Sequence, residues 1–100
     1  MEIIFTPLAK KHLRELKAYI SRKSYPSRAE AYVGRILDYC EGLSTFPERG
    51  TKRDDILRDL RVVGVEKNTS IAFVVMEDRV LIEGVFYGGR SVEKALKPRK

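Results

Sequence analysis

The chain has 100 residues, a length typical of one domain, and 43% of them are hydrophobic, too many for a disordered chain. No apolar run approaches the roughly 20 residues of a transmembrane helix, and the start lacks the pattern of a secretory signal. A single cysteine and a single histidine exclude an internal disulfide and a cluster of metal ligands. We therefore expect one cytoplasmic domain over residues 1–100, without a metal or another cofactor.

The net charge of +6 is distributed unevenly along the chain. Residues 9–26 carry a formal charge of +5 and residues 88–100 carry +4, whereas the rest of the chain is mildly acidic. Two basic zones of this kind suit an acidic partner, such as a nucleic acid or an acidic protein segment. They also suit a surface that is merely solvated, so direct binding to nucleic acid stays open.

A short apolar strand over residues 3–5 stops before Pro7, and an amphipathic helix follows to about Lys23. Thr6 is placed to cap this helix, with Pro7 at its first position. A basic face beside the apolar stripe comprises Lys10, Arg14 and Lys17. His12 lies off the stripe, and we interpret it as a packed or surface residue rather than a base.

A tight connection leads into a second amphipathic helix, which is expected to run to about Thr45. Ser27 and Glu30 fit a capping box at its start. A short link between two amphipathic helices indicates an antiparallel hairpin. Cys40 falls on the apolar face, so we interpret it as a buried hydrophobic residue and not as a nucleophile.

Residues 51–55 are interpreted as a polar loop. Three strands follow: the first from about Leu57 or Leu60 to Glu66, and the others at about residues 70–76 and 80–87. Short turns join these strands into an antiparallel meander. The first strand is expected to join their sheet, since an isolated strand cannot bury its apolar side. The pattern predicts an α+β fold of order β-α-α-β-β-β, with the helical hairpin packed on a mainly antiparallel four-stranded sheet. The other face of the sheet is expected to stay partly open.

The last strand is apolar enough to be buried on both faces, and it ends at Gly88-Gly89 before Arg90. Arginine forks bind phosphate or carboxylate, which makes Arg90 and Arg61 candidates for anion binding. Tyr87 is placed to supply a phenol near Arg90. The strand directions put the two arginines toward opposite ends of the sheet, roughly 20 Å apart.

An ordered set of short motifs covers nearly the whole chain. The set comprises LRELKAYI (Leu13–Ile20), the helix with Ala29, Arg35 and Ile36, LSTFP (Leu43–Pro47), Gly50, Leu60-Arg61, IAFVV (Ile71–Val75) and VFYGGR (Val85–Arg90). This set resembles the ParE branch of the RelE/ParE toxin superfamily. The resemblance implies the same β-α-α-β-β-β fold and toxicity to a bacterial host. It also implies neutralisation by a cognate ParD-like antitoxin in a hetero-oligomer.

The resemblance implies two possible activities. ParE-like members inhibit DNA gyrase by binding, whereas RelE-like members are ribosome-dependent mRNA endoribonucleases. A nuclease of this kind would use Arg61 and Arg90 at the RNA phosphate, assisted by Lys52 or Arg53. RelE-like nucleases place a tyrosine or histidine after the last arginine, and the tail from Ser91 has neither.

We therefore predict gyrase inhibition, and a degenerate non-toxic binding module is the third interpretation. The residues predicted to contact the target are Arg61, Tyr87, Arg90, Lys94, Lys97 and Arg99. Those predicted to contact the antitoxin are Lys10, Arg14, Lys17 and Arg90. ParE relatives often carry an aspartate after this last arginine, where this chain has Ser91.

Overall fold

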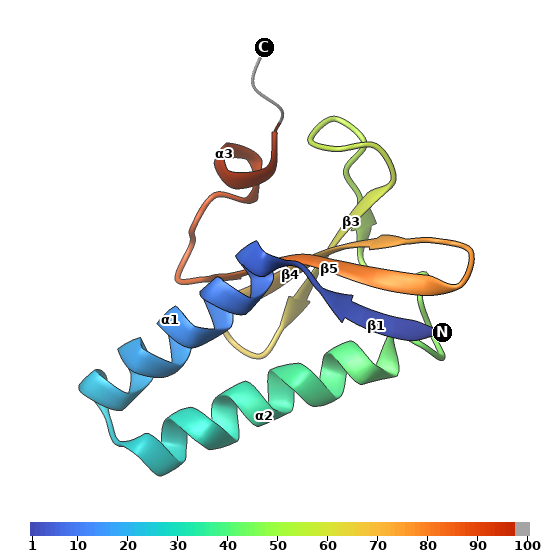
Figure 1. The fold of residues 1–100 in the computed structure, drawn as a ribbon. Helices are drawn as coiled ribbons and strands as arrows, with labels where there is room; N and C mark the ends of the chain where they lie inside the picture. Colours follow the sequence, from blue (N-terminus) through green and yellow to red (C-terminus); the bar gives the residue numbers. More distant parts are fainter. Residues whose placement is uncertain (98–100) are drawn as a thin grey trace.

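The computed structural model describes residues 1–97 and confirms the predicted α+β fold. Its elements in chain order are β1 (Glu2–Phe5), α1 (Pro7–Lys23), α2 (Pro26–Gly42), β2 (Thr51–Lys52), β3 (Leu60–Val65), β4 (Thr69–Val75), β5 (Arg79–Tyr87) and α3 (Val92–Leu96). Figure 1 shows the hairpin of α1 and α2 on one side of the sheet and α3 on the other. Within residues 1–97, no helix has the length and apolar character needed to cross a bilayer.

The sheet has five strands in the order β1-β5-β4-β3-β2, so the predicted count of four is wrong by one. β1 runs parallel to β5, and the other neighbours are antiparallel. The additional strand is β2, in which Thr51 lies opposite Val62 and Lys52 opposite Arg61. Its two residues are exposed and polar, so they show no apolar alternation. Backbone pairing alone makes them a strand.

The first helix starts as predicted, and the second does not. The side chain of Thr6 accepts a hydrogen bond from the N–H of Ala9 at 3.1 Å, with Pro7 at the first helical position. α2 starts at Pro26 after Tyr25, without a side-chain cap, so the capping box at Ser27 is wrong. Proline suits a first helical position, because its φ is preset and the N–H it lacks would have no helical partner. α2 also ends earlier than predicted, at Gly42.

The main core lies between the helical hairpin and one face of the sheet. Its fully buried members include Ala29, Ile36, Cys40, Ile71, Phe73, Val80 and Ile82. Burial raises the pKa of the Cys40 thiol to about 12, so the thiol stays protonated at neutral pH. Cys40 therefore packs as the hydrophobic residue that was predicted.

A smaller core covers part of the opposite face, which was expected to be partly open. Ile56, Leu60, Ala72 and Phe86 are buried there. Val92 and Leu96 of α3 pack against this cluster. α3 was not predicted, because five residues are too few for a periodic pattern to be visible.

A bulge in β5 directs its side chains to both cores. Ile82 lies opposite Phe73, but Gly84 lies opposite Ala72, which leaves Glu83 as an extra residue without a partner. Ile82 and Val85 therefore both enter the main core although they are three residues apart, and Phe86 enters the smaller one. The predicted burial of this strand on both faces is confirmed.

Substitution of Gly84 by alanine tests this packing. A Cβ at Gly84 would lie 2.6 Å from the ring of Phe86 and 3.3 Å from His12. We expect Gly84→Ala to lower the free energy of unfolding by about 1–3 kcal/mol, because both rings must shift. Gly34→Ala is the control: beyond its chain neighbours and the nearby backbone of its own helix, no atom would lie within 4 Å of the added Cβ, and alanine in a helix adds about 0.5–1 kcal/mol of stability. Urea denaturation measures both, and an unchanged stability of Gly84→Ala would contradict the packing.

Candidate functional site

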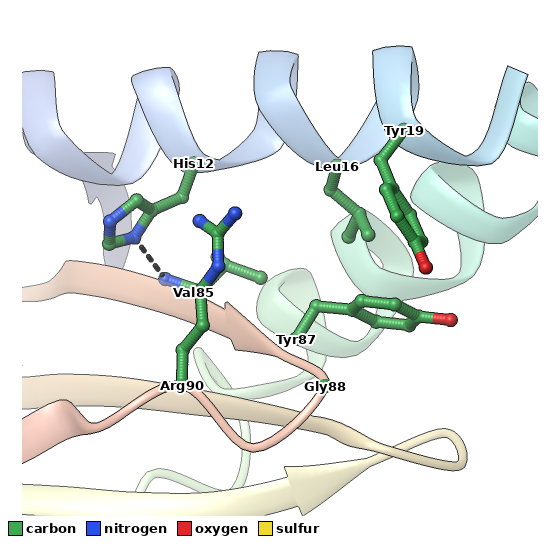
Figure 2. Close-up of a pocket in the computed structure, with 7 residues that line it drawn as sticks. All are labelled: His12, Leu16, Tyr19, Val85, Tyr87, Gly88 and Arg90. Atoms are coloured by element: carbon green, nitrogen blue, oxygen red, sulfur yellow. Dashed lines mark hydrogen bonds between the residues drawn. The ribbon is translucent and has the colours of Figure 1, made fainter. Parts of the chain in front are cut away.

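A two-glycine turn follows β5 and leads to Arg90 and then to α3. Gly88 and Gly89 have φ angles of 68° and 81°, in the left-handed region that residues with a Cβ rarely adopt. The N–H of Gly88 donates to the carbonyl of Asn68 at 2.9 Å and joins the turn to the β3–β4 connection. Figure 2 shows the side chain of Arg90 pointing from this turn toward α1.

α1 completes the edge of β5 where β1 ends. β1 pairs with β5 only as far as Ile82. The next hydrogen bonds come from the start of α1: the N–H of Thr6 donates to Ile82 at 3.1 Å, and its hydroxyl donates to the carbonyl of Glu83 at 3.3 Å. The N–H of Val85 then donates to Nδ1 of His12 at 3.0 Å. α1 is thereby fixed along the second half of β5.

His12 is neutral and has a positioning role. Because Nδ1 accepts a hydrogen bond, we assign the ring proton to Nε2, which points away from Arg90 in Figure 2. The ring packs edge-on against Phe86, with centroids 4.9 Å apart. Burial is the main cause that lowers the pKa of His12, with smaller contributions from Arg90 and Lys11, and Glu15 opposes the shift. His12 is thus a packed residue, as the sequence suggested.

A pocket of about 210 Å³ lies between α1 and the end of β5. Side chains that give it apolar and aromatic walls are Leu16, Tyr19, Val85 and Tyr87. Arg90 supplies its positive charge and is 61% exposed. Nη1 of Arg90 lies 3.6 Å from Oε1 of Glu15, which is an ion pair but too long for a hydrogen bond. Such a site can hold an apolar group beside an anion.

Tyr87 forms a wall of the pocket. Its ring centroid lies 5.6 Å from that of Tyr19 and 6.0 Å from that of Tyr32. Figure 2 shows the hydroxyl groups of Tyr19 and Tyr87 pointing away from Arg90. The predicted phenol beside Arg90 is therefore an aromatic surface, and its hydroxyl is not directed at that guanidinium.

Arg61 lies toward the other end of the sheet, as the strand directions predicted. Arg61 lies opposite Phe73 of β4, and Phe73 lies opposite Ile82 of β5. The last residue of β5, Tyr87, is five residues after Ile82. At about 3.3 Å per residue, Arg61 and the end of β5, from which the chain continues to Arg90, are roughly 15 Å apart along the strand direction. Arg61 lines a separate pocket of about 280 Å³. The two arginines therefore do not form one compact site.

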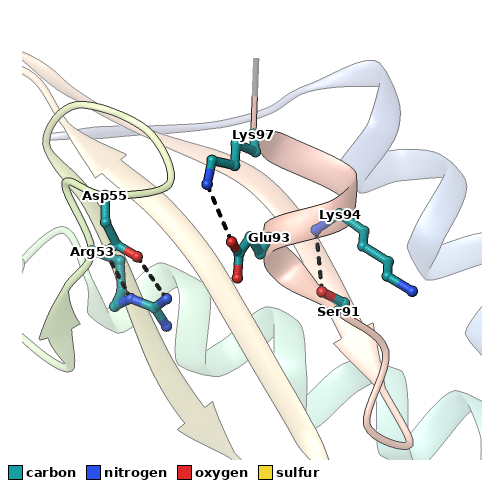
Figure 3. A network of polar contacts seen from close by, with 6 residues as sticks. All are labelled: Arg53, Asp55, Ser91, Glu93, Lys94 and Lys97. Atoms are coloured by element: carbon teal, nitrogen blue, oxygen red, sulfur yellow. Dashed lines mark hydrogen bonds and ion pairs between the residues drawn. The ribbon is translucent and has the colours of Figure 1, made fainter. Parts of the chain in front are cut away.

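Lys52 and Arg53 belong to the part of the sheet that carries Arg61, and neither lines the pocket at Arg90. Lys52 lies opposite Arg61 in the sheet. The guanidinium of Arg53 donates to both carboxylate oxygens of Asp55, at 3.0 and 2.9 Å. This hydrogen bonding lowers the pKa of Asp55, and the charge of Arg53 is largely offset, as its acidic neighbours suggested. Figure 3 shows the pair beside α3.

α3 and its C-cap residue carry two of the predicted target-binding residues. Lys94 and Lys97 are both exposed. Nζ of Lys97 lies 3.3 Å from Oε1 of Glu93, whereas the side chain of Lys94 points away from that pair (Figure 3). The hydroxyl of Ser91 accepts from the N–H of Lys94 at 3.1 Å and caps the helix. We name Lys94 and Lys97 the α3 basic face. Arg99 lies outside the described residues.

The predicted antitoxin-binding residues of α1 lie on the hairpin side of the sheet. We name Lys10, Arg14 and Lys17 the α1 basic face, and all three are exposed. Nζ of Lys17 lies 3.9 Å from Oε1 of Glu30 in α2. Arg90 also points toward α1, but it meets the flank that carries Glu15 and Tyr19, which differs from the flank of the α1 basic face. The α3 basic face lies across the sheet.

The contribution of α1 to the pocket was not predicted. His12, Leu16 and Tyr19 recur at spacings of four and three residues, which places them on one helical face. That spacing was the available signal, but it does not say which strand the face meets. Among residues 1–97, no three His, Cys, Asp or Glu side chains gather in an arrangement that could hold a metal ion.

His12 makes folding stability depend on pH. Its pKa is lowered in the folded chain, so the unfolded chain binds the proton more readily, and stability falls as pH drops below about 6.5. In His12→Asn, an amide oxygen replaces Nδ1 as acceptor but does not titrate. We expect this variant to lose that pH dependence in urea denaturation between pH 8 and pH 5. A profile as steep as that of the unchanged chain would contradict the assignment.

His12→Ala provides the matched comparison at pH 8. It leaves the buried N–H of Val85 without an acceptor, which costs about 1–3 kcal/mol. His12→Asn should lower the free energy of unfolding by less than His12→Ala, because it keeps an acceptor for this N–H and loses only the ring contact with Phe86.

Comparisons with protein-family models and solved structures identify the family of this chain. Residues 3–92 match the family model of the ParE toxin of the type II toxin–antitoxin system parDE. A solved structure, "Chromosomal ParDE TA system from P. aeruginosa", superposes with a TM-score of 0.76 at 19% identity, over 87% of this chain and 95% of that chain. At that identity the likeness shows the fold alone, and no curated protein matches the chain. Because the family model spans nine tenths of the sequence and includes the pocket, the chain belongs to the ParE toxin family of type II toxin–antitoxin systems, as its motifs suggested.

Proposed function

We propose that this chain is a toxin that inhibits DNA gyrase by binding, without a catalytic centre of its own. The observation that carries this choice is the separation of Arg61 from Arg90, which line different pockets. A ribonuclease needs its phosphate-binding and acid–base groups within hydrogen-bond reach of one substrate. The hydroxyl of Tyr87 points away from Arg90 (Figure 2), so the arrangement favours binding over cleavage. Action on gyrase would place the chain in the cytoplasm.

The proposed regulator is a ParD-like antitoxin that forms a hetero-oligomer with the toxin. The α1 basic face offers positive charge on one flank of α1, and Arg90 offers it on another. An acidic amphipathic segment laid along α1 would pair its carboxylates with these residues and bury its apolar side chains. The net charge of +6 would speed association with such a partner.

The proposed gyrase contact has one part at the end of β5 and another at the α3 basic face, on the other side of the sheet. Tyr87, Arg90, Lys94 and Lys97 follow one another along this part of the chain. Arg99 belongs to the same predicted contact, and Arg61 would be a separate part of it at the far end of the sheet. Because Arg90 is proposed to contact both partners, an antitoxin bound there would compete with gyrase.

Expression of the chain alone in a bacterium tests the proposal. Growth should stop, and the purified chain should abolish supercoiling of relaxed plasmid by gyrase or trap cleaved DNA. Toeprinting on translating ribosomes should find mRNA intact. Cleaved mRNA with active gyrase would instead support the RelE-like nuclease, and normal growth would support the non-toxic binding module.

Charge reversal separates the two proposed surfaces. Lys94→Glu/Lys97→Glu should raise the concentration needed to inhibit gyrase by roughly tenfold or more, because it opposes the charge of the proposed contact. Lys10→Glu/Arg14→Glu is the control with the same change in charge. It should keep the inhibition of supercoiling and weaken binding to the antitoxin.

All four substituted lysine and arginine side chains are exposed, so both double variants should fold. Urea denaturation checks this. Equal loss of gyrase inhibition in both double variants would mean that net charge, and not the α3 basic face, carries the contact.

A further inference from the structure

The guanidinium of Arg90 is held loosely. Its partner Glu15 lies at 3.6 Å without a hydrogen bond, and the two side chains are 61% and 44% exposed. Exposed ion pairs of this kind contribute about 0–1 kcal/mol. A carboxylate that reached Arg90 with two direct hydrogen bonds would form a stronger pair and could displace Glu15.

The space beside Arg90 suits an aliphatic side chain. The pocket of about 210 Å³ is bordered by Leu16 and Val85 and by the rings of Tyr19 and Tyr87. Tyr19 remains 39% exposed, so an incoming apolar group would cover surface that water now contacts. The aliphatic group and the carboxylate would then lie next to each other.

We propose that this pocket receives two neighbouring groups of one acidic partner segment. An aliphatic side chain would occupy the space between Leu16 and the tyrosines, and a carboxylate would replace Glu15 at Arg90. Glu15 is then an internal stand-in for the partner's carboxylate, and it disfavours segments that lack one. The identity of the partner as the antitoxin rests on the proposed function.

A carboxylate fits better than a phosphate. Arg90 is the cation among the residues that line the pocket, and a dianionic phosphate would remain poorly neutralised there. The tyrosine hydroxyl groups point away from Arg90 and supply no further donors (Figure 2). Glu15 would also repel a dianion more strongly than a single carboxylate.

N-acetyl-leucine is the probe, because it joins one aliphatic side chain to one carboxylate. Its uncharged match is N-acetyl-leucinamide, and N-acetylalanine lacks the larger side chain. NMR titration of the full chain should show saturable shifts of Nε of Arg90 and of the rings of Tyr19 and Tyr87. We expect roughly fivefold weaker binding of the amide and of N-acetylalanine. Equal binding of the acid and the amide would overturn the proposal, as would tighter binding of inorganic phosphate at the same nuclei.

Two variants test the role of Glu15. Glu15→Gln should tighten binding of N-acetyl-leucine by roughly two- to fivefold, the factor that corresponds to one exposed ion pair. Arg90→Gln should abolish the preference for the acid over the amide. Both positions are exposed, so folding should be unaffected. Unchanged or weaker binding of N-acetyl-leucine to Glu15→Gln would contradict the proposal that an incoming carboxylate replaces Glu15 at Arg90. The titration contains neither antitoxin nor gyrase, so its failure is distinct from failure of the proposed function.

Discussion

The hydrogen bond from the N–H of Val85 to Nδ1 of His12 holds α1 against the half of β5 that β1 leaves unpaired. A buried N–H without a partner costs about 1–3 kcal/mol, so the position of α1 is coupled to the stability of the sheet. Leu16 follows His12 by about one turn of the helix and Tyr19 by about two, so both face the end of β5. The pocket at Arg90 is therefore a consequence of how the edge of this strand is completed.

Much of the fold was predictable, because long elements leave a period in the sequence. The apolar stripe of α1 and the runs of β4 and β5 are of this kind. β2 and α3 were not predictable, since each depends on contacts made elsewhere. β2 exists because Lys52 and its neighbour pair with β3. α3 is held by its cap at Ser91 and by contact of Leu96 with the smaller core.

The site was predictable only in part, for a related reason. Strand directions alone separate Arg61 from Arg90, and the glycine pair signals the turn before Arg90. The partners of Arg90 could not be deduced, because they depend on which strand α1 covers. The extra residue Glu83 also reverses the facing of every later side chain in β5, so Val85 meets α1. A bulge leaves no clear mark in a continuous apolar run.

The central claim is that a ParE-family chain with two separated basic surfaces acts on gyrase by contact. Amide hydrogen exchange of the chain, alone and with saturating gyrase, tests this claim directly. The predicted result is slower exchange over residues 88–97, where the turn after β5 meets α3, with little change in α1. Exchange that is unchanged throughout the chain in the presence of gyrase would contradict the claim.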